Sequence, residues 1–198
     1  MLPVRRVCVF CGSNTGRNAA YSAAAGALGE SIAKQGVTLV YGGGRVGLMG
    51  VVADAVLGLG GRVVGVIPRA IATDEVAHPD LTELHVVGSM HERKALMADL
   101  AQGFVALPGG FGTLDELCEI LTWAQLGMHR KPVGLLNVEG YFDPLLAFLD
   151  QAVLDGFVRP SHRRLLIEGR DPSRILHLLS RSKAPVVSKW LDGRADLR

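Results

Sequence analysis

The residues best suited to chemistry lie in one stretch, L-P-G-G-F-G-T-L-D-E, at positions 107–116. An apolar run precedes it and a helical spacing of apolar residues follows it, which predicts a strand that feeds a helix through a glycine-rich turn. Such a turn directs backbone N–H groups and the positive end of a helix dipole at one point, which suits an anion, above all a phosphate. Glu116 adds a carboxylate in the first helical turn. An anion site beside a carboxylate indicates chemistry on a phosphorylated substrate.

The polar residues of this stretch also have structural interpretations. Acids in a first helical turn stabilise the helix by themselves, so one of Asp115 and Glu116 is expected to do only that. Thr113 caps the helix, gives its hydroxyl to a phosphate, or does both. Thr122 lies inside the predicted helix, where a threonine more often packs or hydrogen-bonds to the preceding turn.

A second glycine-rich stretch, Y-G-G-G-R-V-G-L-M-G, occupies positions 41–50 and contains G-x-G-x-x-G. The dinucleotide fingerprint also expects an acid at the end of the following strand, but that strand ends in Val66-Ile67-Pro68. This favours contact with a phosphate or a mononucleotide. Tight turns explain some of these glycines, but five glycines in nine residues favour the close approach of a ligand.

The third motif is a charged run, M-H-E-R-K, at positions 90–94, at the start of a predicted helix. A solvated charged face is the ordinary interpretation of such a run. However, the helix dipole disfavours cations in a first turn, and Arg93 and Lys94 stand there. An arginine near the ends of the strands can hold a phosphate or a carboxylate with its fork of donors.

Composition excludes several classes of protein. The 198 residues are 48% hydrophobic and 20% charged, as expected for one globular domain with a sizeable core. A formal net charge of +2 gives no reason to expect nucleic acid or membrane binding. We find neither a membrane-spanning apolar run nor a cleavable signal, and therefore expect a cytoplasmic protein.

Neither a metal nor a cofactor is expected. Cys8 and Cys11 have a redox spacing, but they lie along a predicted strand, where residues three apart face opposite sides. We expect ordinary buried cysteines. His91-Glu92 lacks the second histidine of a zinc-protease motif.

Strand and helix patterns alternate along the chain, and the strands are apolar without alternation. This predicts an α/β fold: a Rossmann-like, doubly wound, mostly parallel sheet with helices on both faces. One nucleotide-binding catalytic domain is expected at 1–182, followed by a tail at 183–198. Ligands of such folds bind beyond the C-terminal ends of the strands, where the three glycine-bearing loops can meet.

The predicted strands are 4–10, 37–41, 62–67, 84–87, 104–107, 131–137 and 165–168. The predicted helices are 19–35, 48–59, 90–100, one ending near 126, 144–155 and 172–180. Loop residues expected at the site include Gly12, Ser13, Gly43, Gly44 and Gly109.

Together these motifs resemble the paired signature of the LOG (Lonely Guy) family. The resemblance is carried by P-G-G-F-G-T-L-D-E at 108–116 and M-H-E-R-K at 90–94. It extends over roughly residues 4–158 through C-G-S at 11–13, Y-G-G-G-x-x-G-L-M-G at 41–50, T-W-A-Q-L-G at 122–127 and K-P-V-G-L-L-N at 131–137.

The resemblance implies a cytokinin riboside 5′-monophosphate phosphoribohydrolase. Such an enzyme hydrolyses the N-glycosidic bond of N6-substituted AMP, and in many members of AMP, to free base and ribose 5-phosphate. It implies Arg93 and Glu116 as the catalytic pair, and a homodimer with its active site near the interface. The label lysine decarboxylase is also attached to the family, but no cofactor-binding lysine motif is present here. Substrate contacts implied by the resemblance are Glu75, Lys94, Gly110, Phe111, Gly112, Thr113, Leu114, Asp115, Glu116 and Thr122.

Two other functions are compatible with the same glycine-rich anion site. One is a phosphoribohydrolase for purine nucleotides in general salvage. The other is a non-catalytic carrier of a nucleotide or cofactor, which would bind nucleotide without releasing base. The presence of both Arg93 and Glu116 counts against a carrier.

Overall fold

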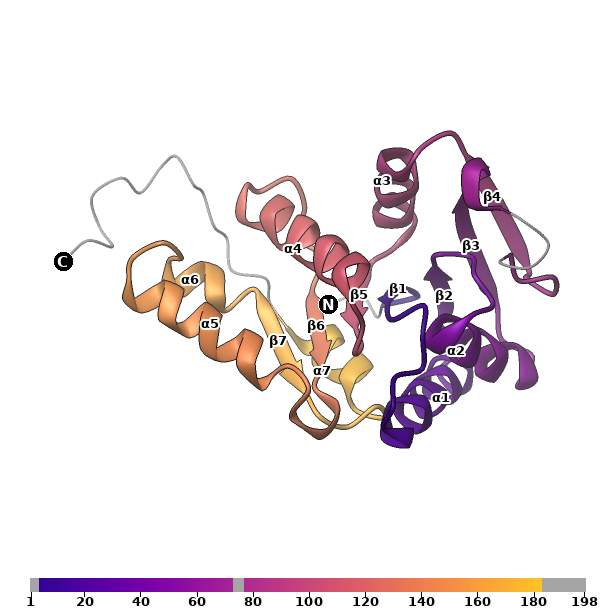
Figure 1. The fold of residues 1–198 in the computed structure, drawn as a ribbon, viewed down its shortest axis with the longest axis horizontal. Helices are drawn as coiled ribbons and strands as arrows, with labels where there is room; N and C mark the ends of the chain where they lie inside the picture. Colours follow the sequence, from indigo (N-terminus) through magenta and orange to yellow (C-terminus); the bar gives the residue numbers. More distant parts are fainter. Residues whose placement is uncertain (1–3, 73–76, 183–198) are drawn as a thin grey trace.

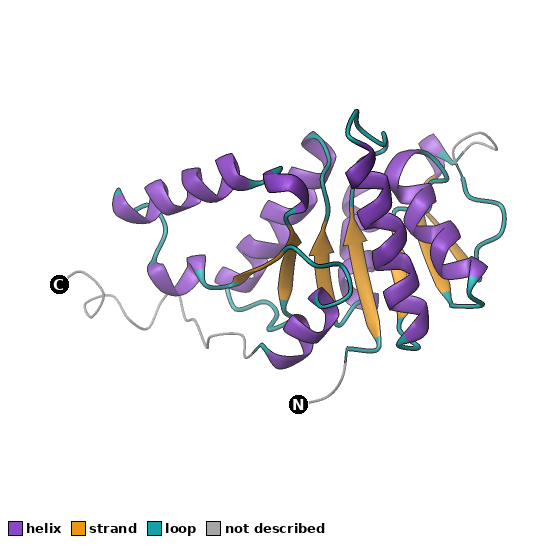
Figure 2. Ribbon diagram, turned by 90° about the horizontal axis from the view of Figure 1, so that it is seen from below, coloured by secondary structure: helices purple, strands orange, loops and turns teal. Residues whose placement is uncertain are grey.

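A parallel β-sheet with helices on both faces forms the body of the molecule (Figures 1 and 2). The computed structural model describes residues 4–72 and 77–182, and over these ranges seven strands form one sheet in the order β4-β3-β2-β1-β5-β6-β7. Every strand pair is parallel. The predicted fold class is thereby confirmed. The strands are β1 (Arg6–Phe10), β2 (Thr38–Tyr41), β3 (Val63–Pro68), β4 (Glu83–Val87), β5 (Gly103–Ala106), β6 (Val133–Leu136) and β7 (Leu166–Gly169).

Two clusters of buried apolar side chains pack the sheet against its two layers of helices. One cluster joins the sheet to α1 (Ala19–Lys34), α2 (Gly47–Gly58) and α7 (Ile175–Arg181). The other joins it to α3 (Met90–Leu100), α4 (Phe111–Gln125) and α5 (Asp143–Leu154). Because both faces are covered, the central strands read as continuous apolar runs. The short segments η1 (Arg69–Ile71), η2 (Val138–Gly140) and α6 (Pro160–Arg163) complete the described elements.

The strand order reverses at β1, which pairs with β2 on one side and β5 on the other. Crossovers on the two sides of this point lead away from each other, which leaves a crevice at the C-terminal edge of the sheet. Phe10 is in register with Ala106, so the loops after β1 and β5 leave the sheet together. A backbone hydrogen bond of 3.0 Å, from Gly12 N to Pro108 O, ties these two loops. The glycine-rich turn found in the sequence therefore lies at the switch point.

The predicted elements all occur, with bounds that differ by a few residues. The starts of two helices differ most: α4 begins at Phe111 rather than after Thr113, and α7 begins at Ile175 rather than at 172. Cys8 and Cys11 are free and buried in opposite clusters, as the strand argument predicted. No helix among the described residues is long and apolar enough to cross a membrane. The predicted tail at 183–198 lies outside the described residues.

Candidate active site

A cavity of about 230 Å³ opens at the switch point. Its wall is formed by the end of β1 and its loop, by the glycine after β2, and by side chains from α2, α3 and the first turn of α4. It therefore joins all three sequence motifs. The lining residues are Val9, Cys11, Gly12, Ser13, Gly42, Met49, Arg93, Gly110, Phe111, Gly112, Thr113 and Glu116.

The first turn of α4 forms one side of this cavity. Gly110 is the N-cap and provides no side-chain cap, so the first N–H groups of the helix have no partner within the helix. A Cβ on Gly110 or Gly112 would meet nothing within 4 Å, whereas on Gly109 it would lie 2.7 Å from Thr113 Cβ. Crowding explains glycine at 109. The open space at 110 and 112 is what a bound anion requires.

Thr113 lies in the third position of α4, with only 3% of its surface exposed. The prediction that it caps the helix is wrong, because α4 begins two residues before it. Thr113 does line the cavity, so the other predicted role stays a prediction: its hydroxyl would donate a hydrogen bond to a bound phosphate.

Arg93 reaches the cavity from the start of α3. Ser89 caps this helix, since its Oγ accepts a hydrogen bond from Glu92 N at 3.1 Å, while the Glu92 carboxylate accepts one from Gly88 N at 2.7 Å. Reciprocal capping of this kind fixes where the helix begins. Arg93 follows directly and points its guanidinium across the cavity toward α4.

The Arg93 guanidinium is buried with few partners. Its Nη2 lies 3.8 Å from Glu116 Oε1 and 3.4 Å from Gly42 O, and its Nε has no hydrogen-bond partner within the described residues. Each side chain of the Arg93–Glu116 pair is only 10% exposed. A buried guanidinium with unused donors is well suited to an anionic or hydroxyl-bearing ligand.

Glu116 is the buried carboxyl group of the cavity. Burial raises its pKa from the ordinary value of 4.5 to about 7, because the attraction of Arg93 only partly offsets the loss of hydration. The attraction of Arg93 favours the ionised form of Glu116, but burial outweighs it. A carboxyl group with this pKa can accept or release a proton near neutral pH.

Lys94 turns away from the cavity toward α4. Its Nζ lies 3.0 Å from Asp115 Oδ2 and 3.2 Å from Glu119 Oε1, and its side chain is 11% exposed. Although burial opposes them, these two carboxylates raise the pKa of Lys94. Because α4 begins at Phe111, it has no acid in its first turn, so the prediction that Asp115 or Glu116 stabilises the helix from that turn is wrong. Asp115 instead pairs with Lys94, which links α3 to α4. Neither residue lines the cavity.

The second glycine-rich stretch owes its glycines to contacts within the protein. A Cβ on Gly42 would collide with the Arg93 guanidinium. Gly43 and Gly47 adopt φ values of +75° and +61°, and Gly47 packs against the backbone of Ser13. Close packing therefore explains Gly42, Gly43 and Gly47 without a ligand. Gly42 also lines the cavity, so the approach of a ligand to this stretch stays a prediction.

Several residues predicted to bind substrate lie elsewhere in the described structure. Gly43 packs on β3, and Gly44 pairs with Ala77 in an isolated bridge. Thr122 donates a hydrogen bond of 2.7 Å to Cys118 O, the ordinary role considered for it. Leu114 is half-buried against the apolar cluster on its side of the sheet. Glu75 lies outside the described residues.

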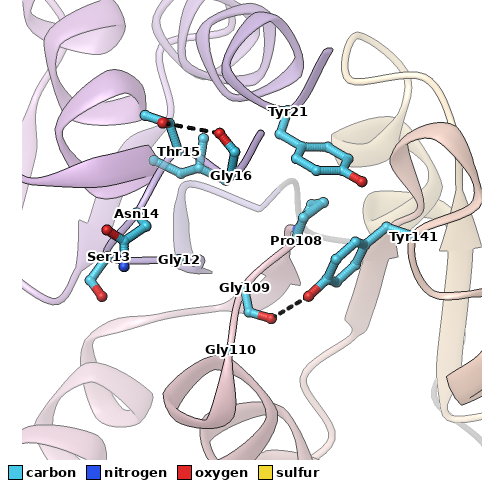
Figure 3. A pocket seen from close by; sticks show the side chains of 11 residues that line it. Gly12, Ser13, Asn14, Thr15, Gly16, Tyr21, Pro108, Gly109, Gly110 and Tyr141 are labelled. Carbon is cyan, nitrogen blue, oxygen red and sulfur yellow. Dashed lines mark hydrogen bonds between the residues drawn. The ribbon is translucent and has the colours of Figure 1, made fainter. Parts of the chain in front are cut away.

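A second pocket of about 260 Å³ adjoins the cavity (Figure 3). The two share Gly12, Ser13 and Gly110. Tyr21 of α1 and Tyr141, which follows η2, border the pocket opposite the loop after β1. Sequence reasoning missed both tyrosines, because no motif or spacing links them to the glycine turn. Among the described residues, no three His, Cys, Asp or Glu side chains gather as a metal site would require.

Comparison with known proteins gives a consistent result. Residues 49–179 match a family model described as "possible lysine decarboxylase". The chain is 56% identical over 175 residues to probable cytokinin riboside 5′-monophosphate phosphoribohydrolase LOGL9 of Oryza sativa subsp. japonica, covering 88% of this chain and 77% of the relative. It is 49% identical to cytokinin riboside 5′-monophosphate phosphoribohydrolase LOG7 of Arabidopsis thaliana, with 88% and 81% covered.

Solved structures agree with the fold. A molybdenum cofactor binding protein from Rippkaea orientalis superposes with a TM-score of 0.68 at 22% identity, covering 90% of this chain and 96% of that one. The molybdenum cofactor carrier protein of Chlamydomonas reinhardtii gives a TM-score of 0.66 at 23% identity, with the same coverage. At such identities these likenesses show the architecture alone.

Proposed function

We propose that this chain, which belongs to the LOG family of cytokinin riboside 5′-monophosphate phosphoribohydrolases, hydrolyses the N-glycosidic bond of N6-substituted AMP and of AMP. The products are the free base and ribose 5-phosphate. The observation that carries the proposal is a buried carboxyl group, Glu116, next to Arg93 and one turn from an uncapped, glycine-rich helix start. Such a site offers a phosphate anchor and a catalytic group within one cavity.

The 5′-phosphate binds at the first turn of α4. The N–H groups of Gly110 to Thr113 and the helix dipole attract the dianion, and the Thr113 hydroxyl adds a further donor. The phosphate is remote from the bond that breaks, so its binding energy holds the ribose in the reactive orientation.

Glu116 acts at the sugar. Cleavage of a glycosidic bond passes through an oxocarbenium-like state, with positive charge on the ribose, which a carboxylate stabilises. In its ionised form Glu116 also takes a proton from the attacking water. The C1′–N bond breaks as the bond from C1′ to the water oxygen forms, and the departing base takes up a proton. Arg93 orients Glu116 and contacts the ribose or the phosphate.

Direct assay of the purified chain tests this proposal. Incubation with AMP and with isopentenyladenosine monophosphate should release free base and ribose 5-phosphate in equal amounts. Loss of general acid–base help costs about 10²–10⁴ in rate, so Glu116→Gln should lose most turnover while still binding nucleotide. Arg93→Ala should do similar damage. Near-normal release of adenine by Glu116→Gln would remove this carboxyl group from the mechanism.

A matched control lies one turn further along α4. Glu119 is also an acid facing α3, but it contacts Lys94 and does not line the cavity. Glu119→Gln should therefore keep most of the turnover, because Lys94 retains Asp115. Rates on GMP and IMP beside AMP and isopentenyladenosine monophosphate separate cytokinin activation from general purine salvage. Nucleotide binding without release of base would instead indicate a carrier.

Amino-acid decarboxylation, the description of the matching family model, is a poorer fit. Enzymes that form Schiff bases need a lysine amine inside the cavity. Lys94 is paired with two carboxylates, and Lys131 donates to Ala98 O at 2.7 Å. Lys34, the remaining lysine of the described ranges, pairs with Glu30 on α1. None of the three lines the cavity.

We also propose a homodimer whose interface lies near the cavity mouth. The family resemblance implies it, and two exposed apolar side chains support it. Phe111, which lines the cavity, is 94% exposed, and Met90, which contacts Arg93, is 45% exposed. An aromatic ring so exposed beside a site is typical of an interface. Light scattering should give about twice the chain mass, and Phe111→Ser should shift the balance toward monomer. A monomeric wild-type chain that is fully active would contradict the dimer proposal.

A further inference from the structure

The geometry of the second pocket points to Tyr141 as a positioning residue for phosphate binding. We infer that its hydroxyl fixes the orientation of the Gly109–Gly110 peptide, so that the Gly110 N–H is presented to the 5′-phosphate. The inference rests on the proposed function, because it assumes that the first turn of α4 holds a phosphate. It adds a residue outside the motifs at 90–94 and 108–116.

One hydrogen bond carries the idea. Tyr141 Oη donates to Gly109 O at 2.7 Å, across the pocket shown in Figure 3. In a trans peptide the C=O and the following N–H point in opposite directions. A Gly109 carbonyl turned toward Tyr141 therefore turns the Gly110 N–H away from it. Gly110 borders both the pocket, which Tyr141 lines, and the cavity, which Arg93 and Glu116 line. We therefore infer that the N–H turned away from Tyr141 faces the cavity.

This peptide needs such a restraint because glycines flank it on both sides. Glycine has no Cβ to resist rotation, so the 109–110 peptide plane can turn over more easily than an ordinary one. Turned over, it would present a carbonyl oxygen to the phosphate and repel it. The neighbouring bonds, Gly12 N to Pro108 O and Leu114 N to Gly110 O, hold the two ends of the turn and leave this plane free.

Tyr141 is itself held firmly. Its ring meets Tyr21 edge-on with centroids 5.5 Å apart, and meets Phe142 edge-on at 4.9 Å. The preceding turn contains Glu139 at φ +51°, a left-handed conformation that few side chains adopt. Asn137 Oδ1 accepts a hydrogen bond of 2.9 Å from Phe142 N and so closes this turn. Strain retained at such a position is consistent with a functional purpose for the turn.

The variant Tyr141→Phe tests the inference, because it keeps the ring contacts and removes only the hydroxyl. One lost hydrogen bond should raise the KM for AMP and weaken ribose 5-phosphate binding by about three- to tenfold. The remaining N–H groups of the turn still hold the phosphate and the orientation of the ribose, so kcat should change little. Inhibition by adenosine, which has no phosphate, should be unchanged. A merely structural defect would affect adenosine and AMP alike.

Tyr21→Phe is the matched control. Tyr21 lines the same pocket, but within the described ranges its hydroxyl makes no hydrogen bond, so its KM and ribose 5-phosphate affinity should equal those of wild type. Equal values for wild type and Tyr141→Phe, or equal losses in both variants, would overturn the inference. So would a fall in kcat at unchanged KM.

The two levels of proposal fail in different ways. A wild-type chain that releases no base from AMP or isopentenyladenosine monophosphate refutes the proposed function. Calorimetric titration with ribose 5-phosphate still compares wild type with Tyr141→Phe in that case. A wild type that does not bind ribose 5-phosphate refutes the role of Tyr141 as well.

Discussion

Replacing Glu116 by glutamine should stabilise the fold at high pH although it removes turnover. Burial raises the pKa of Glu116 from 4.5 to about 7, and Arg93 at 3.8 Å offsets this only in part. Between these two pH values the folded chain holds a proton that the unfolded chain has released. The free energy of unfolding contributed by this group therefore falls as pH rises through that window. Below it both states are protonated, and above it neither is.

The size of the effect follows from the two pKa values. The difference between 4.5 and about 7 corresponds, at about 1.4 kcal/mol per pH unit, to about 3 kcal/mol. Glutamine has the shape of the protonated acid and carries no charge, so Glu116→Gln escapes this destabilisation above pH 7. For a domain of this size each kcal/mol moves Tm by about 2–4 °C, which gives about 6–12 °C at pH 8.

Thermal and urea unfolding of wild type, Glu116→Gln and Glu119→Gln at about pH 4, 6 and 8 measure this directly. Glu116→Gln should match wild type near pH 4 and exceed it progressively toward pH 8. Glu119→Gln should show no such gain, because Glu119 faces Lys94 and is partly exposed. A stability difference that does not vary with pH would refute the reasoning. So would a less stable Glu116→Gln at pH 8, because the Arg93 attraction would then outweigh burial.

Four further outcomes are expected. Release of base should rise with pH around a midpoint near 7, where Glu116 ionises, and a flat profile across that region would exclude its ionised form as the working one. Gly112→Ala places a Cβ in open space of the cavity, so Tm should hold while the KM for AMP rises; an unchanged KM would place the phosphate elsewhere. Lys94→Met should lower the free energy of unfolding by about 1–3 kcal/mol and reduce kcat, measured by urea titration and steady-state kinetics, and a variant as stable and active as wild type would show that the two ion pairs are dispensable. Cys118 is exposed and should be alkylated in the native protein, whereas mass spectrometry should find the two buried cysteines modified only after unfolding.

The sequence predicts local features of this fold well. The apolar strands indicate a sheet covered on both faces, and Gly36, at φ +65°, follows α1 as the helix-stop pattern predicts. The start of α4 is misplaced because its first turn, F-G-T, contains weak helix formers. These residues are helical because a backbone hydrogen bond from Gly12 N to Pro108 O holds the preceding loop against the loop after β1. Local helix propensity does not include such a contact.

Long-range contacts at the site are what sequence reasoning misses. Nothing in M-H-E-R-K says that Arg93 faces Glu116 whereas Lys94 faces Asp115 and Glu119. Tyr141 gives no signal at all, since its partner, Gly109, lies 32 positions earlier. Such pairings depend on how the helices and loops pack on the sheet, so they follow from the fold and not from spacing.

The missing side chain at Gly42 has a consequence for how this protein can change. Its absence leaves the room that the Arg93 guanidinium occupies, 51 positions further along the chain. A mutation that enlarges residue 42 therefore collides first with the arginine, and loss of the arginine should remove most of that cost and leave the milder contact with Met49 Sδ at 3.3 Å. The two positions are epistatic, and neither can be replaced independently by a lineage that keeps the activity. A double-mutant comparison of Gly42→Ala with and without Arg93→Ala would give this dependence a value.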